Sequence, residues 1–286
     1  MIIGGDKKTV IENIKKATES NLLNIKVEEN DAVLTDREKN SITDRYLKNL
    51  PTFSYKFKRI WANALASVLT NILNKDTEII NPENYTSING GAIITSNHFN
   101  PIDSTPIRLL CKKYGHKRLY TVSRESNFVM PGVVGFLMNY ADTIPISDNI
   151  RYTSSDFAGI IEKNLKKGKN VLIYPEQEMW FNYKKPRPLK IGAYHYAAKY
   201  NVPIVSCFVE MRETDKNDNG QFKKVKYTLH VLPPIYPSPD KSPRENSRMM
   251  QQVDTQQKTE AYERIYNKKL DYSFDYSDIA GYIMGN

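Results

Sequence analysis

The stretch GAIITSNHFNPIDSTP, residues 91–106, holds the local signals that decide the fold around it. Its first six residues form a short apolar run, which predicts a buried strand. Pro101 then disfavours helical geometry at the residue before it. Pro106 suits the first turn of a helix that Ser104 or Thr105 caps. We therefore predict a strand, a tight loop and a helix in immediate succession.

Segments of the same two kinds alternate along the rest of the chain. Apolar runs bounded by turn residues are followed by segments with helical periodicity, and this alternation predicts a sheet with helices on its faces. The predicted class is α/β, with a mixed, largely parallel β-sheet flanked by helices and an N-terminal helical, amphipathic extension. The expected strands are residues 91–96, 118–124, 142–147, 170–176, 202–210 and 225–235, and the expected helices are 107–115, 131–140, 154–168 and 191–201.

Composition divides the chain into three parts. Residues 1–75 are predicted to form an N-terminal helical segment, and residues 76–236 the α/β domain. Residues 237–286 begin with a Pro-rich linker and continue into a polar helix, roughly 246–270. The weak apolar face of that helix predicts a peripheral element.

Residues 53–74, within the N-terminal segment, predict a strongly amphipathic helix. Its first half combines aromatic residues with Lys56 and Arg59, as interfacial membrane helices often do. Two interpretations follow: the apolar face packs on the protein's own core, as in most amphipathic helices, or it docks on a membrane. This face consists of Phe53, Phe57, Ile60, Trp61, Ala64, Leu65, Val68 and Ile72.

Composition also restricts the class of protein. The 286-residue chain has a formal net charge of +9, which favours acidic partners such as nucleic acid, anionic lipid or phosphorylated small molecules. No run approaches ~18 consecutive apolar residues, and the N-terminus lacks the apolar stretch of a signal peptide. Cys111 and Cys207 form neither a metal-ligand spacing nor a disulfide framework. A reducing, cytoplasmic compartment is the simplest interpretation.

His98 and Asp103 follow the first predicted strand, where ligand sites gather in α/β sheets. A regular helix would turn ~500° over this five-residue step and direct the side chains about 140° apart, but a tight loop can fold Asp103 back toward His98. In one interpretation the carboxylate orients the imidazole for proton abstraction from a hydroxyl. In the other, Asp103 lies near a helix N-terminus for electrostatic reasons and His98 is an ordinary loop histidine. Glu176 follows another predicted buried strand, and nothing local requires it there.

Asn97, His98 and Asp103 form the sequence N-H-x4-D, and further short segments follow it in a fixed order. With these segments the chain resembles the glycerolipid acyltransferases of the 1-acylglycerol-3-phosphate acyltransferase type. The resemblance extends from about residue 90 to 210. The partial matches to the other family motifs are Tyr174, Pro175 and Glu176 for Pro-Glu-Gly, Lys190, Gly192 and Ala197 for Lys-x-Gly before an Ala-containing helix, and Val202, Pro203, Ile204 and Val205 for a Val-Pro-centred strand.

Two of the family's motifs are altered. The third usually continues Gly-Thr-Arg-Ser, whereas residues 177–180 read Gln-Glu-Met-Trp. The second normally ends in an arginine, whereas this chain has Ser147 and Asp148 there. Those arginines are thought to hold the acceptor's phosphate in the family. Candidate substitutes are Arg124, Arg151, Lys184, Lys185 and Arg187.

The resemblance implies transfer of a fatty acyl group from a thioester, acyl-CoA or acyl carrier protein, to a hydroxyl. The expected acceptor is a lysophospholipid such as 1-acylglycerol-3-phosphate, in phospholipid biosynthesis. His98 is then the general base, and Asp103 orients and polarises it. No metal and no redox cofactor is implied. The residues expected to bind substrate are Asn97, Glu176, Arg124 and Lys190, of which Glu176 belongs either to the acceptor site or to the structural shell of the pocket.

This chemistry also affects the interpretation of helix 53–74, because an enzyme without a membrane span must still reach lipids in a bilayer. We therefore favour its docking on an anionic membrane surface, which predicts a cytoplasmic protein bound peripherally to the inner face of the cell membrane. Two rival functions stay open: a thioester hydrolase that uses water, and a non-catalytic lipid- or nucleic-acid-binding relative. No G-x-S-x-G elbow, P-loop or zinc pattern occurs, and we expect no nucleic-acid partner.

Overall fold

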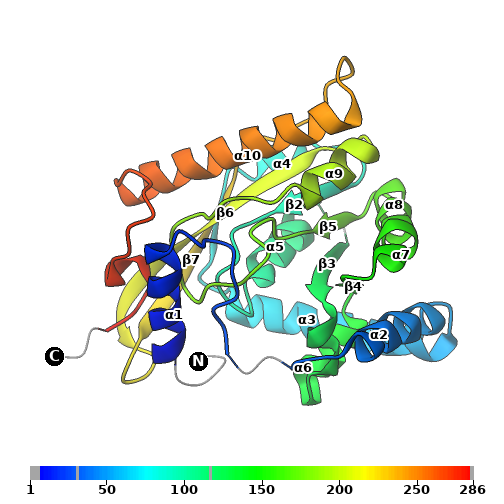
Figure 1. Cartoon of the computed structure of the whole chain (residues 1–286), viewed down its shortest axis with the longest axis horizontal. Coiled ribbons are helices and arrows are strands. Elements are labelled where there is room, and N and C mark those ends of the chain that lie inside the picture. The colour runs from blue at the N-terminus through cyan, green and yellow to red at the C-terminus, as the bar shows by residue number, and fades with distance from the viewer. Residues whose placement is uncertain (1–6, 30–31, 116–117, 284–286) are drawn as a thin grey trace.

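The computed structural model of the chain describes residues 7–29, 32–115 and 118–283, which are arranged around a seven-stranded sheet (Figure 1). The strand order is β1-β7-β6-β2-β5-β3-β4. β6 and β7 pair antiparallel, and the other neighbouring strands pair parallel. The predicted α/β class with a mixed, largely parallel sheet is therefore confirmed. The strands are β1 (Glu78–Ile80), β2 (Ala92–Thr95), β3 (Leu119–Arg124), β4 (Thr143–Ile146), β5 (Asn170–Leu172), β6 (Ile204–Asn217) and β7 (Lys223–Val231).

Helices cover both faces of this sheet, and several of them continue into or out of short 3₁₀ or π turns. The α-helices are α1 (Lys8–Glu19), α2 (Asp36–Asn49), α3 (Phe53–Leu73), α4 (Glu83–Thr86), α5 (Ser104–Leu110), α6 (Gly132–Tyr140), α7 (Ile150–Tyr152), α8 (Ala158–Lys166), α9 (Gly192–Lys199) and α10 (Pro243–Tyr266). The other turns are η1 (Cys111–Gly115), η2 (Glu125–Val129), η3 (Thr153–Phe157) and η4 (Tyr276–Asp278).

The central strands are buried on both faces because their side chains alternate between two helical layers. Ile94 of β2 and Leu172 of β5 pack in one cluster with residues of α4 and α5. Ile93 and Val171, each one residue earlier, pack in the opposite cluster with residues of α8, α9 and α10. Burial on both faces is the reason that these strands appear in the sequence as unbroken apolar runs.

The polar helix that we expected to be peripheral is α10, and this expectation is wrong. α10 packs against α9 and β6, and it runs along the molecule as the long orange helix of Figure 1. Its buried face is polar, since Asp254 and Lys258 form a buried ion pair there. The hydroxyls of Thr95, Ser206 and Tyr194 donate to Asp254. An apolar pattern does not reveal such burial, because hydrogen bonds and an ion pair replace apolar contacts.

The N-terminal segment is spread over the α/β domain. α1 joins a cluster with Trp180, which follows β5, and with Ile279 near the other end of the chain. α2 packs through Ile42 and Tyr46 on Phe128. Two distant parts of the chain therefore share one apolar cluster beside the loop that follows β5.

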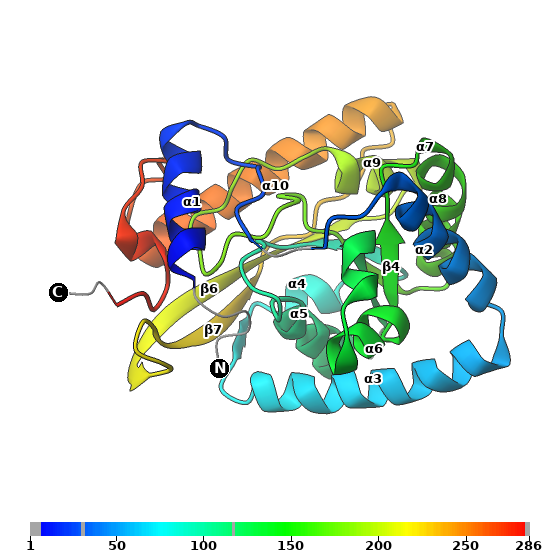
Figure 2. The same cartoon turned by 60° about the horizontal axis from the view of Figure 1, so that its bottom comes forward.

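α3 lies across α5 and α6 (Figure 2). The apolar face that we predicted for it is exposed. Its buried residues are Tyr55, Ala62 and Thr70. Packing of the predicted face on the protein's own core is therefore not observed. In the described part of the chain, no helix is both long and apolar enough to cross a membrane. The outward residues are Phe53, Phe57, Ile60, Trp61, Val68 and Ile72, each 54% to 83% exposed.

Candidate active site

The loop after β2 brings His98 and Asp103 together. His98 Nδ1 lies 2.7 Å from Asp103 Oδ2. The same oxygen accepts hydrogen bonds from the backbone amides of Phe99 at 3.0 Å and Asn100 at 3.3 Å. Asp103 is the N-cap residue of α5, in place of the Ser104 or Thr105 that we expected, yet its side chain does not cap the helix. The carboxylate is therefore directed at the imidazole and its loop, and not at the helix N-terminus.

The two side chains differ in exposure. The Asp103 side chain is 3% exposed, whereas the His98 side chain is 21% exposed. Because Nδ1 faces the buried carboxylate, the other ring nitrogen, Nε2, is the one left to meet a ligand. A buried acid behind a partly open imidazole is an arrangement that can accept a proton from a hydroxyl.

Tyr174 is a third member of this group, and the sequence analysis gave it no role beyond its place in a motif. Its hydroxyl donates to Asp103 Oδ1 at 2.5 Å. Its ring stacks on the His98 imidazole, with centroids 4.1 Å apart and planes 14° from parallel. Burial and the negative charge of Asp103 raise the pKa of Tyr174 well above its ordinary value, so the hydroxyl stays protonated. A polar side chain at the end of the buried strand β5 was the signal available in the sequence.

Glu176 contacts the backbone of His98, which agrees with the second of its two predicted roles, in the structural shell of the pocket. The side chain is 2% exposed, and Oε2 accepts from the His98 amide at 3.2 Å and from Arg187 Nη2 at 2.8 Å. Oε1 accepts from the Arg187 amide at 3.1 Å. The carbonyl oxygen of His98 accepts from the Trp180 amide at 3.1 Å. The loop after β5 therefore holds the His98 backbone at both its N–H and its C=O.

Asn97 is also enclosed, although we predicted that it contacts substrate. Its Oδ1 accepts from the Val209 amide at 2.8 Å, and its Nδ2 donates to the Val209 carbonyl at 3.0 Å. The residue is buried. This side-chain amide continues the pairing of β2 with β6 by one step, and it thereby sets where the catalytic loop leaves the sheet.

The cations proposed to hold the acceptor's phosphate separate into two groups. Arg187 is buried on Glu176, and Lys185 is buried 2.8 Å from Asp278. Lys184 pairs with Glu213 at 3.1 Å. These three are occupied by structural contacts, whereas Arg124, Arg151 and Lys190 are exposed.

Arg124 and Lys190 are placed around the same edge of the sheet as His98. Arg124 is the last residue of β3, and its guanidinium pairs with Glu178 in the loop after β5. The amide of Lys190 donates to the carbonyl oxygen of Pro175, beside Glu176, at 2.8 Å. Since β5 lies between β2 and β3, both cations are at the edge of the sheet from which the loop of His98 begins.

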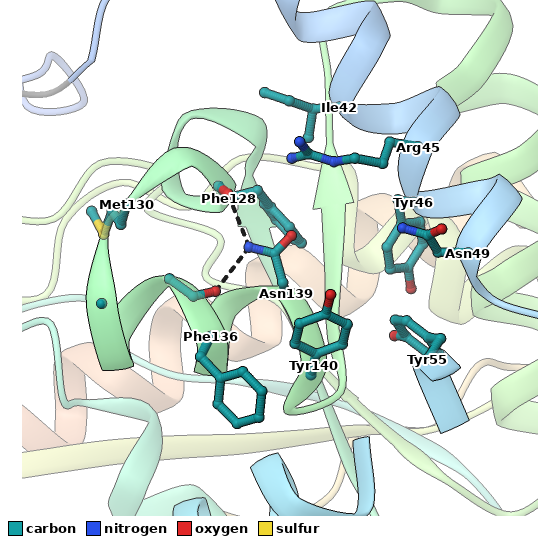
Figure 3. A pocket seen from close by; sticks show the side chains of 12 residues that line it. Ile42, Arg45, Tyr46, Asn49, Tyr55, Phe128, Met130, Phe136, Asn139 and Tyr140 are labelled. Atoms are coloured by element: carbon teal, nitrogen blue, oxygen red, sulfur yellow. Dashed lines mark hydrogen bonds between the residues drawn. The ribbon is translucent and has the colours of Figure 1, made fainter. Parts of the chain in front are cut away.

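A separate pocket of about 310 Å³ lies between α2, α3 and α6 (Figure 3). Tyr46, Tyr55 and Tyr140, one from each helix, meet there, and the ring centroids of Tyr55 and Tyr140 are 5.6 Å apart. Burial raises the pKa of both Tyr46 and Tyr55. Neither His98 nor Asp103 is among the described residues that line this pocket. It therefore belongs to the junction that holds α3, apart from the His98 group.

Comparison with known proteins agrees with this geometry. A sequence model of the acyltransferase family matches residues 76–210. The fold is similar to the crystal structure of the 1-acyl-sn-glycerophosphate (LPA) acyltransferase PlsC from Thermotoga maritima, with a TM-score of 0.52 and 14% sequence identity over 92% of this chain and 97% of that one. No curated protein sequence matches the chain significantly. The matched residues contain the His98–Asp103 loop, the strands that carry it and the Glu176 loop, and residues 76–210 therefore form a domain of the acyltransferase family.

Proposed function

We propose that this acyltransferase moves a fatty acyl group from a thioester donor to a free hydroxyl of a lysophospholipid, with 1-acylglycerol-3-phosphate as the expected acceptor. The observation that carries the proposal is the 2.7 Å contact between His98 Nδ1 and Asp103 within the segment that matches the family. Acyl-CoA or acyl carrier protein supplies the thioester, and the reaction as proposed requires no resident metal or redox cofactor.

The proposed reaction is a direct transfer. Asp103 accepts the Nδ1–H of neutral His98, so Nε2 is free to take the proton of the acceptor hydroxyl. The hydroxyl oxygen forms a bond to the thioester carbonyl carbon, the carbon–sulfur bond breaks, and the imidazolium returns its proton to the leaving thiolate. Positioned proton transfer contributes ~10²–10⁴-fold to the rate. The hydrogen bond from the His98 amide to Glu176 keeps the base in place during both proton transfers.

For the acceptor's phosphate, Arg124 and Lys190 are the proposed partners. Both are exposed at the same edge of the sheet as the His98 loop, whereas Lys184, Lys185 and Arg187 form structural ion pairs. A phosphate that approaches Arg124 replaces Glu178 as the partner of its guanidinium. Arginine suits this role because its planar donors match phosphate oxygens.

We also propose that α3 docks the enzyme on an anionic membrane surface, as a peripheral protein of the cytoplasmic leaflet. The outward apolar face of α3 has no cover from the described residues, and Lys56 and Lys58 are exposed beside it. Aromatic and basic residues together suit the boundary between headgroups and acyl chains. Tyr55 anchors the opposite side of α3 in the junction of Figure 3, which holds the helix to the domain.

Acyl transfer is tested by mass spectrometry of lipid products after incubation with labelled acyl-CoA or acyl carrier protein and a panel of lysophospholipids. We expect a diacyl product from the wild type and none above background from a folded His98→Ala variant. Full activity in that variant overturns the proposal. Release of free fatty acid at the same rate with and without acceptors favours the hydrolase instead.

Membrane docking is tested by co-sedimentation with vesicles of phosphatidylglycerol and phosphatidylcholine. Trp61→Glu places a charge on the exposed face of α3, and we expect it to weaken binding about tenfold or more. The control is Lys75→Glu, at an exposed residue just beyond α3. It changes the net charge more than Trp61→Glu does, but it leaves the apolar face intact, so it tests the loss of basic charge alone. Equal binding by wild type and Trp61→Glu, on vesicles with or without anionic lipid, contradicts docking by this face.

A further inference from the structure

Tyr174 contacts both members of the catalytic pair, through two different parts of its side chain. Its hydroxyl bonds to Asp103 Oδ1, and His98 bonds to the other oxygen, Oδ2. Its ring covers one face of the imidazole. The Asp103 carboxylate consequently divides its negative charge between an imidazole, a phenol and two backbone amides.

We propose that Tyr174 is a positioning residue of this pair, whose ring supports the imidazole while its hydroxyl limits how strongly Asp103 attracts a proton to His98. The proposal rests on the general-base role of His98 proposed above. A hydrogen bond to a carboxylate stabilises its charge, so less of that charge is available to stabilise the imidazolium.

Other titratable groups next to the pair do not substitute for this effect. Burial raises the pKa of both Tyr227 and Cys207, so these side chains stay neutral. Burial lowers the pKa of Arg108 and Arg187, although both remain cations because the ordinary pKa of an arginine side chain is so high. Glu176 faces the His98 amide and is already paired with Arg187. Among the described residues, the titratable groups near Tyr174 and the pair come from α5, the segment after β5, β6 and β7, and they are Arg108, Glu176, Arg187, Cys207 and Tyr227.

Two substitutions separate the hydroxyl from the ring. Tyr174→Phe removes the hydrogen bond and keeps the stacked ring, so the acid limb of the kcat/KM profile should move to higher pH by ~0.5–1 pH unit. Tyr174→Leu removes the ring as well, and the rate should fall about tenfold or more at every pH because the imidazole loses its support.

The matched control is Tyr227→Phe. Tyr227 packs on Phe99 of the same loop with ring centroids 5.4 Å apart, and no hydrogen bond to Asp103 is described for it. This variant also loses one buried tyrosine hydroxyl near the pair. We expect its pH profile to follow that of the wild type.

The experiment measures kcat/KM against pH for the wild type and these three variants, together with an NMR titration of the His98 ring signals. The chain has four histidines, and comparison with His98→Asn identifies the signals of His98. An upward shift of the midpoint in Tyr174→Phe, in both the rate profile and the titration, with no shift in Tyr227→Phe, supports the proposal. An unchanged or lowered midpoint, or equal shifts in both variants, overturns it.

The NMR measurement requires no substrate, so it distinguishes the two proposals. Loss of activity in His98→Ala with an unshifted Tyr174→Phe titration rejects the tyrosine's role alone. Retained activity in His98→Ala rejects the general-base role, whatever the titration gives. A merely structural tyrosine would lower stability and rate in Tyr174→Phe without moving either midpoint.

Discussion

Two buried aspartates lie beside the end of β2, and their surroundings differ in one respect. Asp254 interacts with Thr95, Tyr194, Ser206 and Lys258, which are all buried. Asp103 is just as buried, but its imidazole partner is 21% exposed. A buried carboxylate therefore stabilises the fold when all its partners are buried, and it can support catalysis when one partner is partly exposed to solvent.

The largest effect on activity should come from removing the charge of Asp103, whose partner His98 is partly exposed. Asp103→Asn keeps the size of the side chain but offers a weaker, uncharged acceptor to Nδ1–H. We expect kcat/KM for acyl transfer to fall about 10³-fold, with little change in the midpoint of thermal unfolding. Steady-state kinetics and a melting curve on the same preparation check both parts. A loss of less than tenfold would mean that the carboxylate does not orient the base.

Changes to the enclosed pair of Asp254 and Lys258 should lower the stability of the fold and leave the rate of acyl transfer unchanged. Lys258→Met leaves Asp254 as an uncompensated buried charge, which should lower the free energy of unfolding by ~3–5 kcal/mol. Urea unfolding measures this, and the folded fraction should keep its specific activity. The control is the double variant Asp254→Leu/Lys258→Met, which buries no charge and should be less destabilised. Equal losses in the single and double variants would contradict the charge explanation.

Glu176 should give an intermediate result, because it is enclosed like Asp254 but holds the catalytic loop. Glu176→Gln removes the charge opposite Arg187 and should cost about 2 kcal/mol of unfolding free energy. It should also lower kcat about tenfold by loosening His98, with KM for the lysophospholipid unchanged. A raised KM with normal kcat would favour the other predicted role of Glu176, contact with the acceptor.

Acid should also reduce the stability that the Asp254–Lys258 pair provides, but by less than the substitutions above. Burial on its own raises the pKa of Asp254, but the charge of Lys258 and the hydrogen bonds outweigh it, so the pKa lies below its ordinary value. A group of this kind stabilises the fold fully above its unfolded pKa of about 3.9, and that stabilisation is lost as the pH falls through the folded value. The wild type should therefore lose up to ~1.4 kcal/mol per pH unit from this group below about pH 4. Urea unfolding at several acid pH values should give a shallower dependence for the Asp254→Leu/Lys258→Met variant.

Most of the fold could be predicted from local signals. Strands such as β2 and β5 are buried on both faces, so they stand out as apolar runs, and turn residues separate them from the helices. The position of α10 could not be predicted in this way. Its buried residues include Asp254 and Lys258, which a count of apolar positions assigns to solvent.

The candidate site was predictable in part. His98 and Asp103 are five residues apart, and Pro101 between them indicated the loop that joins them. Asn97 and Glu176 were identified as site residues, but their hydrogen-bond partners could not be, since these partners lie far away in the sequence. Asn97 bonds to Val209, 112 residues later, and Glu176 bonds to the amide of His98, 78 residues earlier.

The sequence by itself therefore determined the α/β class and the tight loop after β2 that can bring Asp103 back toward His98, because proline geometry and apolar periodicity act over a few residues. Only the tertiary structure decided that Tyr174 shares the Asp103 carboxylate, that Glu176 and Asn97 brace the loop, and that the apolar face of α3 is turned outward. These contacts depend on which strands become neighbours and in what register. That choice follows from the packing of the whole sheet, and no short stretch of the chain contains it.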